Sequence, residues 1–259
     1  MKIEDKETVF NEYKPNNIYN VDCYEAIKKI PDKSIDLVYV DIPYLIDSGG
    51  CSDNELSKRV KRLRNIELED IRHGIDYSIF DEFCRVLKKI YLYIWCNKNQ
   101  IYDVMKYFIE KGCYYELIVW CKTNPTPLTN NTMLPNIEYL LMFREKGCKL
   151  YGDYNTKSKW YISPINKNDK DLYCHPTIKP LEFVKNHILN ATKENDIVLD
   201  CFLGSGTTAV ACKETGRRYI GFEINKDYFK IAQDRINGIS QIDNKLKEAG
   251  IQTIFDFME

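Results

Sequence analysis

Residues 197–208 read IVLDCFLGSGTT, and no other segment says as much about the architecture of the chain. The first part, up to Phe202, is an apolar run of the kind that forms a buried parallel strand. A turn with two glycines follows at 203–206, and a helix is expected from Thr207 to Thr215, just before Gly216. A strand that passes through a glycine turn into a helix is typical of α/β proteins that bind a ligand at the helix N-terminus.

The rest of the chain continues this alternation. Strands are expected at 36–44, 90–96, 115–121, 136–144, 196–202 and 218–223, and helices at 81–89, 100–111, 180–191 and 207–215. Such an alternation predicts an α/β fold with a doubly wound, mostly parallel sheet. With 259 residues, the chain fits a single domain, 1–259, with a small insertion.

Composition restricts the classes of function. The net charge is −1, so any binding of nucleic acid must come from local basic patches. The ten cysteines include no C-x-x-C pair, which argues against zinc and favours buried thiols in a reducing compartment. No apolar segment approaches the roughly 20 residues that span a membrane, and residues 1–13 are too charged for a signal peptide. We therefore expect a cytoplasmic protein with no membrane segment and no metal.

The glycine turn predicts a cofactor site. Gly204 and Gly206 let the backbone approach a ligand closely. The helix that begins at Thr207 and Thr208 offers free N–H groups to a carboxylate or a phosphate. Glu223 ends the following strand, where a carboxylate can accept both hydroxyls of a ribose.

Two residues of this region distinguish between cofactors. Asp200 would attract the cationic methionine end of S-adenosyl-L-methionine and would repel a pyrophosphate. Ala209 stands where an NAD-binding turn would carry its third glycine. We therefore expect S-adenosyl-L-methionine, and the alternative is an NAD-dependent oxidoreductase.

A second motif, Asp41-Ile42-Pro43-Tyr44, ends the apolar run 36–44. The amino group of adenine is a weak nucleophile because its lone pair is delocalised into the ring. The Asp41 carboxylate and the Ile42 carbonyl could accept its two N–H groups and free that lone pair. Pro43 would stiffen the turn, and Tyr44 would stack on an extruded base. Alone, the motif is more typical of a plain turn after a strand, but the accompanying cofactor turn favours a catalytic corner.

With both motifs present, the sequence resembles the bacterial DNA amino-methyltransferases of the β class. In that family a D-P-P-Y-type motif precedes an F-x-G-x-G motif, as Asp41-Ile42-Pro43-Tyr44 precedes Phe202-Leu203-Gly204-Ser205-Gly206 here. Segment 20–26 (NVDCYEA) is similar to the family's adenine-binding segment, and 175–181 (HPTIKPL) to its H-x-T-x-K-P segment. The resemblance implies a Rossmann-like, seven-stranded sheet of the methyltransferase type with a small inserted recognition region.

The resemblance also implies individual roles. Asp22 and Cys23 would contact the cofactor adenine, Glu223 its ribose, and Thr177 and Lys179 the neighbourhood of its carboxylate. The full expected cofactor site comprises Asp22, Cys23, Asp41, Thr177, Lys179, Asp200, Phe202, Gly204, Gly206, Thr207, Thr208 and Glu223.

The first position of the catalytic motif bears on the target base. Asp41 resembles the adenine-N6 enzymes, whereas serine is commoner there in the cytosine-N4 enzymes. We expect site-specific methylation of adenine N6 in double-stranded DNA, with cytosine N4 and a non-catalytic DNA-binding relic as alternatives. Ile42 replaces the family's usual proline, but the chemistry needs its carbonyl and not a ring. An Ile42→Pro variant is therefore expected to be active.

Two segments lie outside the expected sheet. Segment 45–78 is interpreted as a mobile or DNA-contacting loop, and the alternative is a solvated helix face. Its basic run comprises Lys58, Arg59, Lys61, Arg62 and Arg64. Segment 147–173, with Lys157 and Lys159, occupies the place of the family's target-recognition region. Because it is short for a complete reader of DNA sequence, and because family members often dimerise, a homodimer is a further expectation.

Overall fold

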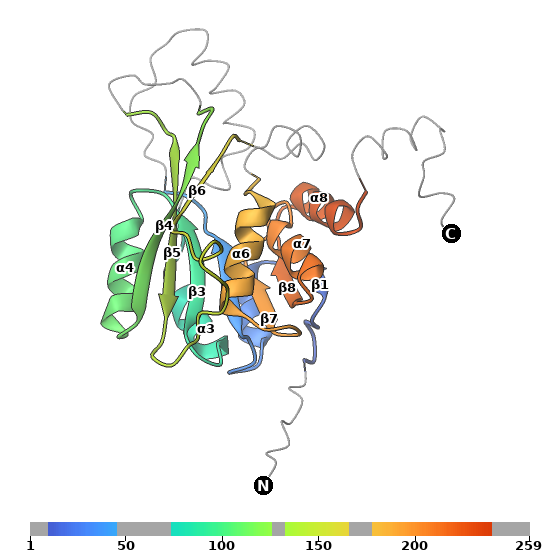
Figure 1. The fold of residues 1–259 in the computed structure, drawn as a ribbon. Helices are drawn as coiled ribbons and strands as arrows, with labels where there is room; N and C mark the ends of the chain where they lie inside the picture. Colours follow the sequence, from blue (N-terminus) through green and yellow to red (C-terminus); the bar gives the residue numbers. More distant parts are fainter. Residues whose placement is uncertain (1–9, 46–73, 126–132, 166–177, 240–259) are drawn as a thin grey trace, which may run out of the picture.

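A computed structural model describes residues 10–45, 74–125, 133–165 and 178–239 (Figure 1). Within these ranges the elements are β1 (Asn17–Tyr19), α1 (Cys23–Ala26), η1 (Ile27–Lys29), β2 (Leu37–Asp41), α3 (Ile79–Val86), β3 (Tyr91–Cys96), α4 (Ile101–Glu110), β4 (Tyr114–Lys122), β5 (Ile137–Arg144), β6 (Trp160–Ser163), α6 (Leu181–Ala191), β7 (Ile197–Asp200), α7 (Thr207–Glu214), β8 (Arg218–Phe222) and α8 (Lys226–Ile236). No helix in the described ranges is both long enough and apolar enough to cross a membrane.

The described strands form one sheet in the order β1-β8-β7-β2-β3-β5-β4-β6. Of these eight strands only β5 is antiparallel to its neighbours, which confirms the predicted mostly parallel α/β fold. The expected number of seven strands is wrong, because β6 adds an eighth at the edge, parallel to β4. This strand arises inside segment 147–173, which was expected to lie outside the sheet. Its four residues are too few to give a periodic signal.

Two layers of helices cover opposite faces of the sheet (Figure 1). Along β2, Val38 and Val40 join the core cluster that contains residues of α1, α3 and α4. Leu37 and Tyr39 join the other cluster, with residues of α6, α7 and α8. A strand that is buried on both faces reads as a continuous apolar run, which is why the sequence indicated β2 so clearly.

The chain changes direction across the sheet between β2 and β7. From β2 it continues through α3 to β3 on one side, and from β7 through α7 to β8 on the other. The two strands pair in parallel through Leu37↔Val198 and Val38↔Leu199. Their last residues, Asp41 and Asp200, therefore emerge at the same edge, at the switch point where open α/β sheets bind ligands.

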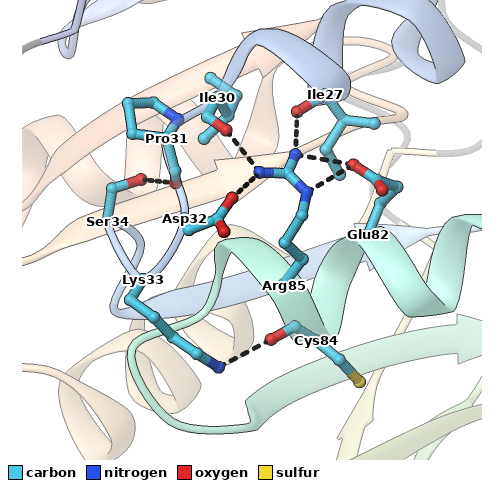
Figure 2. A network of polar contacts seen from close by, with 9 residues as sticks. All are labelled: Ile27, Ile30, Pro31, Asp32, Lys33, Ser34, Glu82, Cys84 and Arg85. Carbon is cyan, nitrogen blue, oxygen red and sulfur yellow. Dashed lines mark hydrogen bonds and ion pairs between the residues drawn. The ribbon is translucent and has the colours of Figure 1, made fainter.

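At the amino-terminal end of β2, away from the switch point, Arg85 of α3 holds the loop that precedes this strand (Figure 2). Its guanidinium donates to the carbonyls of Ile27 at 2.8 Å and Ile30 at 2.9 Å, and it also pairs with Asp32 and Glu82. The planar guanidinium has enough donors to serve all four partners. This network joins η1 to α3 and lies at the end of β2 away from the switch point, so we interpret it as structural.

Candidate active site

A pocket opens at the carboxyl ends of β2 and β7. Its lining comprises Tyr39, Asp41, Trp95, Lys179, Val184, Asp200, Phe202, Leu203, Gly204, Ser205, Thr207 and Thr208. The lining combines the end of each central strand with the glycine turn, the start of α7 and the segment before α6. The structure thus brings most of the expected cofactor residues into one cavity.

The turn between β7 and α7 depends on Gly206, which caps α7 with a φ of 80°. This left-handed conformation favours glycine. A Cβ at this position would lie 3.1 Å from the Cβ of Ala232 in α8. Gly206 is not among the residues that line the pocket, and its missing side chain makes room for α8. Its assignment to the cofactor stays a prediction. Arg235 of α8 donates to Thr207 Oγ1 at 2.7 Å and to Ser205 Oγ at 3.2 Å, which holds the turn from behind.

Glu223, directly after β8, is hydrogen-bonded to the same turn. Its Oε2 accepts from the N–H of Gly204 at 2.7 Å, and its Oε1 accepts from the N–H of Asn225 at 2.8 Å. Asn20 donates to the backbone carbonyl of Glu223 at 2.7 Å, which brings the end of β1 to the same place. A carboxylate oxygen has capacity for more than one donor, so this carboxylate fits the ribose hydroxyls that the sequence assigned to it.

Asp22 and Cys23 follow Asn20 at the start of α1. Asp22 caps this helix and accepts from the N–H of Tyr24 at 2.8 Å. Burial raises the pKa of the Cys23 thiol to about 12, and the nearby charges of Asp22, Glu223 and Asp200 act in the same direction. A thiol with such a pKa is neutral at physiological pH, so Cys23 offers a small apolar contact surface and not a nucleophile.

Asp200 is the titratable group on which the fit of a cationic cofactor depends. It is 4% exposed, and one carboxylate oxygen accepts from the N–H of Phe202 at 3.0 Å. Burial raises the pKa of this carboxyl to about 7, although hydrogen bonds from Thr208 and Phe202 oppose the shift. A cation that enters the pocket would favour the ionised form and gain a carboxylate partner. The residues present therefore fit the cationic end of S-adenosyl-L-methionine.

The backbone of the Asp41–Tyr44 corner is held by two hydrogen bonds. The N–H of Ile42 donates to the carbonyl of Trp95 at 3.2 Å, which extends the β2–β3 ladder by one residue. Gln100 donates through its side-chain amide to the carbonyl of Pro43 at 2.8 Å. A proline in place of Ile42 could not make the first of these bonds. Ile42 thus contributes a backbone contact that the family's usual residue lacks.

The two carboxylate oxygens of Asp41 differ. Oδ2 lies 2.9 Å from Nζ of Lys179, whereas Oδ1 is buried with no hydrogen-bond partner among the described residues. A buried acceptor without a donor is costly, and native proteins rarely leave one without reason. Oδ1 is therefore the polar atom of this corner that is available to a ligand N–H.

Lys179 connects Asp41 to charged residues that the sequence did not reveal. Its Nζ lies 2.7 Å from Oε2 of Glu138 on β5 and donates to the hydroxyl of Tyr44 at 3.0 Å. Oε1 of Glu138 lies 2.5 Å from Nζ of Lys122 on β4. Burial would raise the pKa of Glu138, but Lys179 and Lys122 outweigh it and bring the pKa to about 2. Two carboxylates and two ammonium groups thus form one balanced cluster beside the pocket.

The predicted DNA contacts are only partly described. Lys58, Arg59, Lys61, Arg62 and Arg64 lie outside the described residues, and so does Thr177 of the expected cofactor site. Lys157 and Lys159 are exposed just before β6, where Lys159 pairs with Glu116 of β4. The assignment of these lysines to DNA stays a prediction.

Similarity to known proteins agrees with this site. The model of the DNA methylase family matches residues 35–234. Type II methyltransferase M2.LlaDCHI of Lactococcus lactis subsp. cremoris is 30% identical, over 85% of this chain and 88% of its own length. M.HinfI of Haemophilus influenzae is 28% identical over 90% of this chain and 71% of its own. M2.DpnII of Streptococcus pneumoniae is 30% identical over 83% of this chain and 87% of its own.

Solved structures share the fold. The crystal structure of the M1.HpyAVI–SAM complex has a TM-score of 0.64 and 25% identity, and the match covers 85% of this chain and 98% of that chain. PvuII DNA methyltransferase, which is cytosine-N4-specific, has a TM-score of 0.62 over 87% of this chain and 96% of its own. At 16% identity it is evidence of a common fold alone.

The family match includes both the Asp41–Tyr44 corner and the glycine turn. It confirms the predicted kind of enzyme and S-adenosyl-L-methionine as the cofactor, and it excludes the NAD-dependent oxidoreductase. The chain is therefore a DNA methyltransferase that belongs to the N6/N4 DNA methylase family.

Proposed function

We propose that this enzyme transfers the methyl group of S-adenosyl-L-methionine to the exocyclic N6 of an adenine flipped out of double-stranded DNA, with Asp41–Tyr44 as the catalytic corner. One observation carries the proposal. Oδ1 of Asp41 is a buried acceptor without a partner among the described residues, and Asp41 lines the pocket together with the glycine turn. An amine placed there would satisfy this oxygen.

The cofactor supplies an electrophilic methyl group when bound, and the residues of the corner prepare the amine that receives it. Oδ1 of Asp41 would accept one N–H of the amine, and the carbonyl of Ile42 would accept the other. An amine that receives a methyl group has to release one proton, and Oδ1 of Asp41 would be placed to accept it. Burial raises the pKa of Asp41, against the opposing charge of Lys179, which makes the carboxylate a better proton acceptor.

The remaining parts of the corner would position the base. The ring of Tyr44 is half-buried, and its hydroxyl is held by Lys179 at 3.0 Å, so its orientation is fixed before a base arrives. The contact from Gln100 to Pro43 keeps the following turn in place. A site whose parts are already oriented loses less entropy when it closes on its target.

The cofactor would lie along the glycine turn at 203–206, and the carboxylates of Glu223 and Asp200 indicate which part of it lies where. Its adenine would contact Asp22 and Cys23, and its ribose Glu223. Its cationic end would lie beside Asp200. The cofactor carboxylate would face the start of α7 at Thr207 and Thr208, near Lys179, with Phe202, Gly204 and Gly206 forming the turn.

Adenine is favoured over cytosine by the aspartate at the first position of the corner, which resembles the adenine-N6 enzymes. The fold supports no choice between the two bases, because the cytosine-N4-specific PvuII enzyme shares it. Lys157 and Lys159, with the basic run 58–64, would contact DNA phosphates, and a homodimer stays an expectation of the family resemblance.

The test uses the purified full chain and bacterial genomic DNA amplified in vitro, which carries no methylated bases. After reaction with S-adenosyl-L-methionine, the DNA is digested to nucleosides and analysed by mass spectrometry. We expect N6-methyladenine; N4-methylcytosine instead would establish the alternative base. Asp41→Ala should abolish transfer yet keep cofactor binding at least in part in calorimetry, whereas Asp103→Ala on the exposed face of α4 should leave both intact. Equal inactivity of the wild type and Asp41→Ala, with cofactor still bound, would indicate a non-catalytic relic.

A further inference from the structure

We infer that Glu138 is a positioning residue of the catalytic corner. Together with Lys122 it anchors Lys179, so that the ammonium group holds Oδ2 of Asp41 and leaves Oδ1 free for the target amine. This inference rests on the proposed function, because it explains how the catalytic carboxylate is held.

The position of Glu138 follows from the direction of β5. This strand runs antiparallel to β3 and β4, and Glu138 pairs with Trp120 near its beginning. The beginning of β5 therefore lies at the same edge of the sheet as the ends of β2 and β3. The side chains of Glu138, Lys179 and Lys122 are only 17%, 7% and 15% exposed, so the cluster is largely shielded from solvent.

Each donor of Lys179 has a partner. The ammonium lies 2.9 Å from Oδ2 of Asp41, 2.7 Å from Oε2 of Glu138 and 3.0 Å from the hydroxyl of Tyr44, and it sits 4.8 Å from the ring centre of Trp95. A lysine ammonium has three N–H donors. With all three engaged, none is left for Oδ1 of Asp41. Without Glu138, one donor would be free to turn to that oxygen and compete with the amine.

The charge of Glu138 also affects Asp41 directly. Asp41 faces the carboxyls of Glu138 on β5 and Asp200 on β7, the thiol of Cys96 on β3, the hydroxyl of Tyr44 and the ammonium of Lys179. Burial raises the pKa of Asp41 most; of these neighbours, Lys179 and the hydroxyl of Tyr44 lower that pKa, and Glu138 raises it. Removal of the Glu138 charge would take away one of the influences that raise this pKa and leave the lowering by Lys179 and Tyr44 in place, so the carboxylate would become a weaker proton acceptor.

The test compares Glu138→Gln, which keeps the shape but not the charge, with Glu138→Asp, which keeps the charge but not the length. Initial rates of methyl transfer to amplified genomic DNA are measured between pH 5 and 9 over a range of cofactor concentrations up to saturation, which gives both kcat and the KM for the cofactor. We expect Glu138→Gln to lower kcat by about 10- to 100-fold, with an unchanged KM for S-adenosyl-L-methionine and an acidic limb displaced to lower pH. Glu138→Asp should recover part of the loss.

The relative activities of Glu138→Gln and Glu138→Asp show whether Glu138 anchors Lys179 through its charge or only fills space. If Glu138 only filled space, the isosteric glutamine would be the better substitute. Activity of Glu138→Gln equal to or above that of Glu138→Asp, or an acidic limb that does not move, would overturn the inference. Glu214→Gln is the matched control, because it breaks a lysine pair on the exposed surface between α6 and α7.

A second variant covers the case in which Glu138→Gln does not fold. Lys122→Met leaves Glu138 in place but removes a charge that lowers its pKa, so Glu138 would become protonated at higher pH. The acidic limb of the pH–rate profile of Lys122→Met should therefore move to higher pH, and a limb at the same pH as in the wild type would overturn the inference. An inactive wild type would instead refute the proposed function, which keeps the two failures distinct.

Discussion

Replacement of Asp200 by asparagine tests the electrostatics of the pocket through the stability of the protein. In the folded protein, burial raises the pKa of this carboxyl from 3.8 to about 7. Between these values the folded state still holds a proton that the unfolded chain has released. Because the folded state binds more protons, this group makes folding less favourable as pH rises through that range. Asparagine has no such proton and carries no such penalty.

The magnitude follows from the shift in pKa. At about 1.4 kcal/mol per pKa unit, a rise from 3.8 to about 7 removes about 4 kcal/mol of stability above pH 7. His187 acts in the opposite direction, because burial lowers its pKa from 6.5 to about 3 and stability is gained as pH rises between those values. The two contributions largely cancel in the wild type, so only the difference between Asp200→Asn and the wild type isolates Asp200.

The assay is urea unfolding of both proteins without cofactor, at several pH values from 4 to 8.5. An asparagine oxygen can still accept from the N–H of Phe202, so the local backbone should be kept. We expect equal stability near pH 4 and an advantage of about 4 kcal/mol for Asp200→Asn at pH 8. Its affinity for S-adenosyl-L-methionine should fall by about tenfold or more, because a buried cation loses its charged partner.

Asp103→Asn controls for the change in net charge, because it removes a carboxylate from the exposed surface of α4. A difference between Asp200→Asn and the wild type that is constant across pH would refute the reasoning. So would a wild type that is the more stable protein at pH 8, since that result would require a favourable and not a penalised charge in the pocket.

Two substitutions test the backbone around the site. Ile42→Pro removes the N–H that bonds to Trp95 and trims a side chain that is 1% exposed, so thermal melts should show a loss of about 1–3 kcal/mol. Methyl transfer should persist because the carbonyl remains; complete inactivity of a folded variant would contradict the proposed role of that carbonyl. Gly206→Ala should destabilise more than Gly238→Ala, because both glycines have a positive φ but only at Gly206 would a Cβ meet α8. Equal losses in urea unfolding would disprove the close packing of α8 on the turn.

Much of the fold was predictable because its central strands are buried on both faces. Residues of β2, β3 and β7 form continuous apolar runs, and each run is followed by a recognisable turn or helix. The edge strands gave no such signal. β1 has three partly exposed residues and β6 has four, so neither shows a run or an alternation long enough to interpret. The eighth strand was missed for this reason.

The same division applies to the site. Asp41–Tyr44 and the turn after Asp200 are local motifs, so the sequence identified them and the fold brings them together. Glu138 and Lys122 reach the site only through the pairing of β5 with β3 and β4, and pairing partners are not visible in one sequence. For Glu138, the only signal in the sequence was the presence of a glutamate within the apolar run 136–144.

The pairing of β2 with β7 also dictates when the enzyme can form during its synthesis. The N–H of Ile197 donates to the carboxylate of Asp36, which lies 161 positions earlier in the sequence. The strand β1 is separated from its partner β8 by an even longer stretch of sequence. When the ribosome has released the chain only as far as β6, the strands β2, β3, β5 and β4 can already pair. At that stage β2 is an edge strand, because its neighbour β7 has not yet been synthesised. Such an edge carries unpaired N–H and C=O groups that invite association with other chains. A nascent or truncated chain of that length holds Asp41, the proposed catalytic residue, but lacks the strand and turn that would bring a methyl donor to it.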